Sequence, residues 1–97
     1  MRSNPKITIV IVSHNARHYI QDCLESVYHQ NYPRQLSKVV LVDNDSSDST
    51  VGFVRESFPW VKVIENRTNR GFAEANNQGY FLALKNKSDY LVLLNQD

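Results

Sequence analysis

The hydrophobic positions of this chain form short apolar runs that alternate with stripes of helical spacing. The runs lie at 6–12, 38–42, 60–65 and 89–94, and each is rich in β-branched or aliphatic residues. Such runs predict β-strands. The first, KITIVIV, is almost entirely apolar, which is typical of a strand covered on both faces.

Three stripes of apolar residues separate these runs. Their members are Ile20, Cys23, Leu24, Val27 and Tyr28 in the first, Val51, Val54 and Phe58 in the second, and Phe72, Ala75, Gly79, Leu82 and Ala83 in the third. Spacings of three and four residues bring such positions to one side of an amphipathic helix. Asn15 is the candidate N-cap of the first helix, and the segment around Pro33 is expected to end it.

The predicted order is therefore β-α-β-α-β-α-β. Strands separated by helices of this length pair in parallel through right-handed crossovers. The pattern predicts an α/β fold, with an open, mostly parallel sheet of four strands and helices on both faces. This arrangement is Rossmann-like.

A polar cluster follows each predicted strand. The clusters are Ser13–Asn15, Asp43–Asp45, Asn66–Asn69 and Asn95–Asp97. In a parallel sheet all four exits lie at one edge, where open α/β sheets bind their ligands. Polar turns are common at strand ends, so one cluster alone means little. Four clusters at one edge favour a ligand site.

Within these clusters, Asp43 is the residue most suited to ligand binding. It precedes a turn whose other acids and serines are expected to form Asx turns and helix caps. A carboxylate at a strand exit can accept a hydrogen bond from a nucleobase N–H. His14 is either an ordinary loop residue or a ring that stacks on the base. Gly71 supplies a permissive backbone at the start of the third helix.

The last cluster carries oxygen ligands for a metal. Asp97 offers a carboxylate and Asn95, two residues earlier, an amide oxygen. Alternate residues of a strand point to the same side, and Mg²⁺ and Mn²⁺ prefer oxygen ligands. The sequence shows no spacing typical of a zinc site or of a Ser-His-Asp or Cys-His catalytic group.

Composition narrows the class of protein. The 97 residues suffice for one small domain, with 41% hydrophobic and 22% charged residues and a net charge of +1. Scattered basic residues argue against nucleic-acid binding. The lone cysteine, Cys23, mildly favours a reducing compartment, and no run approaches the roughly 18 apolar residues of a membrane span. We therefore expect a cytoplasmic protein, either free or peripheral to the membrane.

Taken in order, four segments resemble the first half of a family-2 inverting glycosyltransferase with the GT-A fold. They are ITIVIVSHN, VVLVDNDSSDST, VKVIENRTNRGFAEANNQG and YLVLLNQD. The rhamnosyltransferase-like branch is the most similar. The resemblance implies a nucleotide-diphosphate sugar donor and a saccharide or lipid-linked acceptor, as in cell-wall or polysaccharide biosynthesis.

The resemblance also implies roles for particular residues. Those implied to bind the nucleotide are Ser13, His14, Asn15, Asp43, Asn69 and Gly71. The Asp-x-Asp motif, which carries Mg²⁺ or Mn²⁺ on the diphosphate, falls on Asn95–Asp97, with Asn95 in place of the first acid.

The family places its general base and acceptor site later in the polypeptide. The resemblance therefore implies that residues 1–97 are the donor-binding half, truncated at the metal motif and inactive alone. It also implies a strand order of 3-2-1-4. The fourth strand would then be an exposed apolar edge open to self-association.

Two other classes of protein remain open at this point. One is a stand-alone α/β nucleotide- or Mg²⁺-binding module, such as a receiver-like domain, which would need an acidic pair after its first strand. The other is a nucleotidyltransferase, which would usually carry a glycine-rich basic loop there. The chain has Ser13–Asn15 at that position, which argues against both.

Overall fold

The computed structural model describes residues 5–30 and 33–95 and contains one four-stranded sheet. The elements are β1 (Ile7–Ser13), α1 (Arg17–Tyr28), the short 3₁₀ helix η1 (Arg34–Leu36), β2 (Ser37–Asn44), α2 (Thr50–Ser57), β3 (Lys62–Asn66), α3 (Phe72–Lys85) and β4 (Tyr90–Asn95). This is the predicted alternation of strands and helices, and each strand begins and ends within two residues of its predicted bounds.

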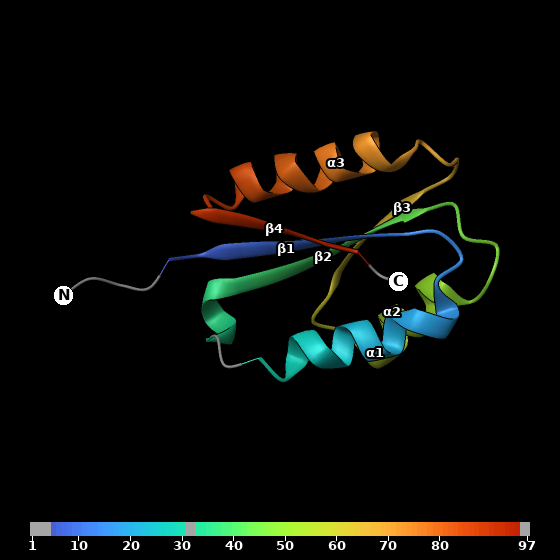
Figure 1. The fold of residues 1–97 in the computed structure, drawn as a ribbon, viewed down its shortest axis with the longest axis horizontal. Coiled ribbons are helices and arrows are strands. Elements are labelled where there is room, and N and C mark those ends of the chain that lie inside the picture. Colours follow the sequence, from blue (N-terminus) through green and yellow to red (C-terminus); the bar gives the residue numbers. More distant parts are fainter. Residues whose placement is uncertain (1–4, 31–32, 96–97) are drawn as a thin grey trace.

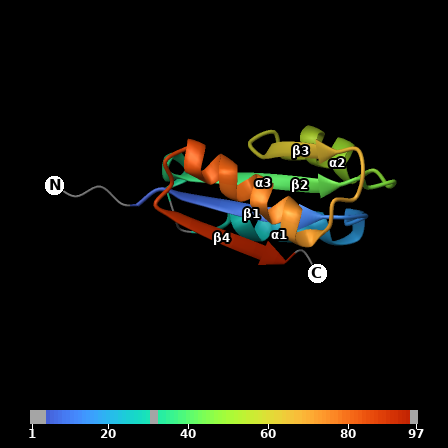
Figure 2. The ribbon, with the colours of Figure 1, turned by 90° about the horizontal axis from the view of Figure 1, so that it is seen from above.

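All strand pairs are parallel, and the order is β3-β2-β1-β4. The order is visible in Figure 2, where the sheet is seen from above. It confirms both the fold class and the order that the family resemblance implied. Among the described residues, β4 is an edge strand that pairs with β1 alone.

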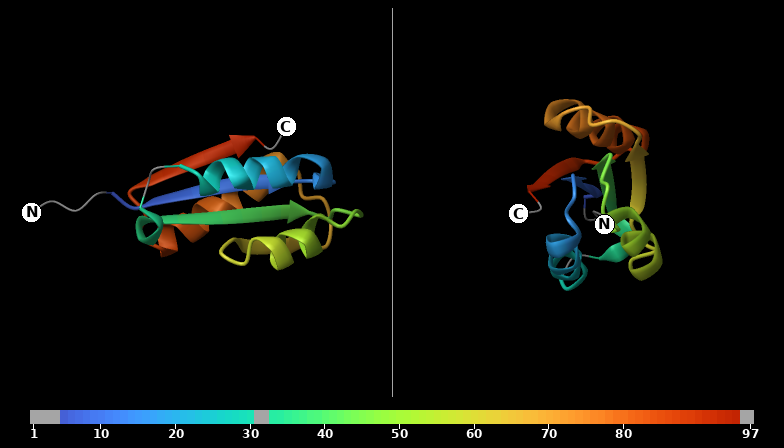
Figure 3. Two further views of the ribbon diagram at one scale, coloured as in Figure 1. Left: turned by 90° about the horizontal axis from the view of Figure 1, so that it is seen from below. Right: turned by 90° about the vertical axis from the view of Figure 1, so that its right-hand side faces the viewer.

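Helices cover both faces of the sheet, in three layers. α3 lies on one face, and α1 and α2 lie together on the other (Figures 1 and 3). The central strands β1 and β2 are buried from Thr8 and Val39 onward, which explains their nearly continuous apolar sequence. Alternate residues divide between two cores. Ile9 and Ile11 pack towards α1 and α2, while Val10 and Val12 pack towards α3.

α3 lies very close to β1 because Gly79 has no side chain. A Cβ built on Gly79 would stand 2.4 Å from Cγ1 of Val10 and 2.6 Å from its Cγ2. Glycine therefore allows the approach of helix and strand that brings Ala75 and Ala83 into the core.

The start of α1 differs from the prediction. The N-cap is Ala16, and Asn15 instead has a left-handed backbone with φ of 54°. The prediction of Asn15 as N-cap was wrong because its side chain binds the loop that follows β2. The helix also ends at Tyr28, well before Pro33.

Candidate functional site

The carboxyl ends of β1 and β2 are joined by a buried hydrogen bond. Ser13 and Asp43 are partners in the parallel register, and the Ser13 hydroxyl donates to Oδ1 of Asp43 at 2.8 Å. Both residues are almost fully buried, with exposed fractions of 0% and 1%. Two residues predicted to bind the nucleotide are thus brought into contact at the sheet edge.

Ser46 supplies the remaining described contacts of Asp43. Its backbone N–H donates to Oδ2 at 2.9 Å, and its hydroxyl donates to Oδ1 at 2.5 Å. A carboxylate has about four lone-pair positions. The described residues therefore fill three of them, two on Oδ1 and one on Oδ2.

Asn15 locks the β1–α1 loop to the β2–α2 loop. Its backbone N–H donates to the Ser46 hydroxyl at 2.8 Å, and its side-chain oxygen accepts from the backbone N–H of Ser47 at 2.7 Å. The positive φ of Asn15 is a conformation that asparagine tolerates better than most residues. The two loops therefore form one interlocked surface above Asp43.

Asp48 ties the starts of α1 and α2 together. Its carboxylate accepts from the backbone N–H of Arg17 at 3.1 Å and of Thr50 at 3.0 Å, and also from the Thr50 hydroxyl. Burial acts to raise the pKa of Asp48, but these hydrogen bonds outweigh it and the pKa is lowered. The anion is thereby stabilised where two helices begin.

His14 is exposed, but its ring has a fixed partner. Nδ1 lies 2.7 Å from the backbone oxygen of Asn44. Because a carbonyl oxygen can only accept, Nδ1 carries the proton. The other ring nitrogen, Nε2, lies 3.5 Å from the Asn15 side-chain amide.

The β3–α3 loop approaches the same edge. Gly71 has φ of 83° at the N-cap of α3, which confirms that a permissive backbone is needed there. Its N–H donates to the Asn69 side-chain oxygen at 2.9 Å, and its carbonyl accepts from the Asn44 side-chain amide at 3.1 Å. The loops after β1, β2 and β3 gather at one end of the sheet in Figure 1.

A network of amide side chains supports this loop and was not predicted. Asn66 donates to Asn44 Oδ1 at 3.0 Å and to Gln78 Oε1 at 2.8 Å, and Gln78 donates back to Asn66 Oδ1 at 2.9 Å. Asn44 and Asn66 are buried. Both residues lie in the polar clusters that follow the predicted strands, but no spacing in the sequence pairs them with Gln78 on α3.

One of the two predicted metal ligands, Asn95, is the last residue of β4. Asn95 is the register partner of Val12, one residue before Ser13, so β4 ends at the same edge as β1. Asp97 lies outside the described residues. Within the described part of the chain, no group of three or more His, Cys, Asp or Glu residues could hold a metal ion.

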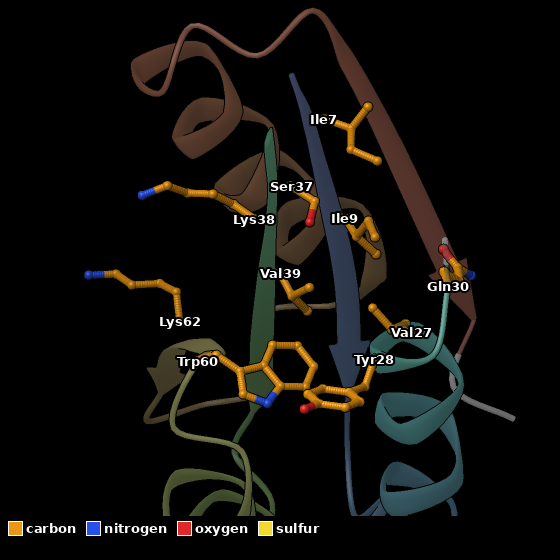
Figure 4. Close-up of a pocket in the computed structure, with 10 residues that line it drawn as sticks. All are labelled: Ile7, Ile9, Val27, Tyr28, Gln30, Ser37, Lys38, Val39, Trp60 and Lys62. Carbon is orange, nitrogen blue, oxygen red and sulfur yellow. The ribbon is translucent and has the colours of Figure 1, made fainter. Parts of the chain in front are cut away.

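The described residues line a polar and an apolar hollow on the surface. A polar one of about 480 Å³ adjoins the carboxyl ends of β2 and β3 and is lined by Asp45, Arg55, Glu65, Asn66 and Arg67. An apolar one of about 280 Å³ lies at the opposite end of the sheet, beside Trp60 and Tyr28 and over Ile9 and Val39. In Figure 4 its two lysines, Lys38 and Lys62, point away from the apolar floor. It is therefore separate from the candidate site.

Comparison with known families decides the class of protein. The family model described as Glycosyl transferase family 2 matches residues 8–97. The chain belongs to this family. Family membership favours the glycosyltransferase interpretation over a receiver-like module or a nucleotidyltransferase.

The curated relatives that the chain matches are also glycosyltransferases. The chain is 30% identical over 96 residues to poly(ribitol-phosphate) beta-glucosyltransferase of Bacillus spizizenii, covering 95% of this chain and 15% of that protein. It is 35% identical over 91 residues to an uncharacterized glycosyltransferase of Haemophilus influenzae, covering 94% of this chain and 29% of that protein. The chain thus spans less than a third of the length of these relatives.

Solved structures give the same fold. The mannosyltransferase PcManGT from Pyrobaculum calidifontis, in complex with GDP-Man and Mn²⁺, matches with a TM-score of 0.77 and 32% identity, over 84% of this chain and 25% of that one. Residues 1–349 of S. aureus TarS, in complex with UDP-GlcNAc, match with a TM-score of 0.85 and 25% identity, over 95% of this chain and 26% of that one.

Across residues 5–30 and 33–95, no helix is long and apolar enough to cross a membrane.

Proposed function

We propose that this chain binds a nucleotide-diphosphate sugar at the carboxyl edge of its sheet. It would form the donor half of an enzyme that transfers the sugar, with inversion, to a saccharide or lipid-linked acceptor. The observation that carries the proposal is the interlocked pair of loops after β1 and β2, with Asp43 held between them by Ser13 and Ser46. This edge lies within the matched residues 8–97.

Asp43 would recognise the base. One position on Oδ2 has no described partner and could accept a ligand N–H. The contact of the partly buried Ser46 hydroxyl with Oδ1 is a second one that a ligand N–H could replace. Uracil, thymine and guanine all present an N–H to such an acceptor. The proposal therefore extends to UDP and GDP donors, which the solved neighbours TarS and PcManGT hold as UDP-GlcNAc and GDP-Man.

The loops beside Asp43 would hold the rest of the nucleotide. His14 and Asn15 come from one side and Asn69 and Gly71 from the other. Fixed backbone and side-chain contacts in both loops lower the ordering cost of binding.

Asn95 and Asp97 would hold Mg²⁺ or Mn²⁺ together with the diphosphate. Such ions are often bound by one or two carboxylates plus substrate phosphates, so a single aspartate is chemically sufficient. The register that ends β4 beside β1 supports this position. A bound cation would stabilise the charge that develops on the leaving diphosphate.

The wider proposals follow the resemblance. The general base that deprotonates the acceptor hydroxyl would lie beyond residue 97, so the 97 residues alone would bind donor without transferring sugar. The small share of each relative that the chain covers supports this division. The rhamnosyltransferase-like branch and a cytoplasmic location, either free or peripheral to the membrane, belong to the same proposal.

Titration calorimetry with UDP, thymidine diphosphate and GDP, with and without Mn²⁺, tests the proposed nucleotide binding. We expect weak binding of at least one nucleotide, and tighter binding with Mn²⁺. Asp43→Asn should weaken binding about tenfold in both conditions, because a neutral amide oxygen accepts a hydrogen bond from the base less strongly than a carboxylate does. The Ser46 backbone N–H can only donate, so the introduced amide keeps its oxygen at the Oδ2 position. Its NH2 group then takes the Oδ1 position, where the Ser13 and Ser46 hydroxyls can accept instead of donate.

Asp97→Ala supplies the matched comparison. It should remove only the part of the affinity that depends on Mn²⁺. Absence of heat with every nucleotide in the presence of Mn²⁺ would overturn the proposal, and equal effects of the two variants in both conditions would overturn the division of roles.

A further inference from the structure

Asn44, the last residue of β2, contacts the loops on both sides of Asp43. Its backbone oxygen accepts from Nδ1 of His14 at 2.7 Å. Its side-chain amide donates to the Gly71 carbonyl at 3.1 Å, and Oδ1 accepts from the Arg70 backbone N–H at 3.3 Å. One residue thus reaches the β1–α1 loop through its backbone and the β3–α3 loop through its side chain.

The side chain of Asn44 has little freedom. Only 3% of the residue is exposed, and Asn66 donates a further hydrogen bond to Oδ1 at 3.0 Å. Asn66 is itself paired in both directions with Gln78 on α3. Buried amides with several partners are rigid, since losing a partner leaves a polar group unpaired.

The contacts of the loop itself explain why it needs this support. Gly71 has a left-handed backbone, and both Arg70 and Gly71 are exposed. Arg70 makes a 3.6 Å ion pair with Glu74, but both side chains are about half exposed, so the pair contributes little. The contacts from Asn44 attach residues 70–71 to the sheet.

We propose that Asn44 is a positioning residue for the donor site. It holds the Asn69–Gly71 segment at a fixed place relative to Asp43 without contacting the nucleotide. This inference rests on the proposed function, because it assumes that Asp43 and the Asn69–Gly71 segment bind the same ligand. The backbone contact with His14 does not depend on the side chain, so a substitution at Asn44 tests the Gly71 side alone.

The test uses Asn44→Ala in two measurements on the purified protein. Amide hydrogen exchange by NMR should show faster exchange at Arg70, about tenfold, because its N–H loses its acceptor. Calorimetry with the nucleotide that the unchanged protein binds should show an affinity about tenfold weaker, since the loop must be ordered on binding. His14 should keep its side-chain chemical shifts.

Two control variants separate positioning from general loss of stability. Val54→Ala removes buried volume from the other face of the sheet, which α1 and α2 cover. It should lower the melting temperature, but at temperatures well below melting it should leave the affinity for the nucleotide unchanged. Asn66→Ala keeps both contacts of Asn44 with residues 70–71 and should weaken binding less than Asn44→Ala.

The outcomes distinguish this inference from the proposed function. If the unchanged protein binds no nucleotide, the proposed function fails, and the inference with it. If it binds but Asn44→Ala keeps full affinity, the inference alone is wrong. Equal losses of affinity in Asn44→Ala and Val54→Ala would also overturn it, because the effect would then follow stability and not the position of the loop.

Discussion

At the scale of single residues, the candidate site is a set of polar side chains whose partners come from distant loops. Asp43 is held by Ser13 and Ser46, and Asn15 binds Ser47 across 32 positions of the chain. Polar groups that are buried or fixed in this way are costly to disturb. The site is therefore ordered before any ligand arrives.

Asp48 gives a pH-dependent test at this scale. Its pKa in the folded protein is lowered from an ordinary value of 3.8. A lowered folded pKa means that the stabilisation is present above the ordinary pKa, and is lost as the pH falls through the folded one. We expect Asp48→Asn to unfold at lower denaturant concentration than the unchanged protein at pH 7.

The difference between the two proteins should shrink as the pH falls below the ordinary pKa of Asp48. Chemical denaturation from pH 7 down to about pH 3 measures it. A difference that stays constant over this range would mean that the charge of Asp48 does not contribute.

At the scale of elements, the close contact of α3 with β1 leaves no room for even one added carbon atom at Gly79. Gly79→Ala places a methyl group against Val10 at less than 3 Å. Forcing extra volume into a packed core typically costs about 1–3 kcal/mol. We expect a loss of stability of that size in chemical denaturation.

Gly52→Ala is the matched control. Gly52 lies within α2, and a Cβ there would meet nothing within 4 Å. Alanine is favoured over glycine inside helices by about 1 kcal/mol. Gly52→Ala should therefore raise stability, and a loss of similar size in both variants would contradict the packing argument.

The elements themselves were predictable because their signals are local. Strand runs and helical stripes follow from periods of about two and 3.6 residues, and the gathering of strand exits at one edge follows from parallel order. The N-cap at Asn15 was wrong because capping preference considers only neighbouring residues, while Asn15 binds Ser47. The pairing of Asn66 with Gln78 depends on how α3 is placed on the sheet, which no local pattern contains.

At the scale of the whole molecule, the two ends of the sheet differ in chemistry. The carboxyl end carries interlocked polar loops, whereas the amino end carries the apolar hollow beside Trp60 and Tyr28 (Figure 4). One side of the sheet also ends in β4, whose Tyr90 and Leu93 are 62% and 51% exposed. Unpaired strand edges of this kind readily add another strand.

We expect the 97-residue chain to self-associate through β4. Light scattering at increasing concentration should show dimers or larger species, and Leu93→Lys should shift the population towards monomer because a charge opposes edge pairing. Leu84→Lys, which changes an exposed leucine on α3, should leave association unchanged. A clean monomer of the unchanged chain at high concentration would contradict the expectation.

The central claim is that the loops at the carboxyl edge bind the nucleotide, and NMR amide shifts during a UDP or GDP titration with Mg²⁺ test it most directly. The account predicts that the amides of Ser13–Asn15, Asp43–Ser46 and Asn69–Gly71 move together, while the Trp60 indole N–H at the other end stays in place. Shifts confined to the Trp60 end, or none at saturating nucleotide, would contradict the claim.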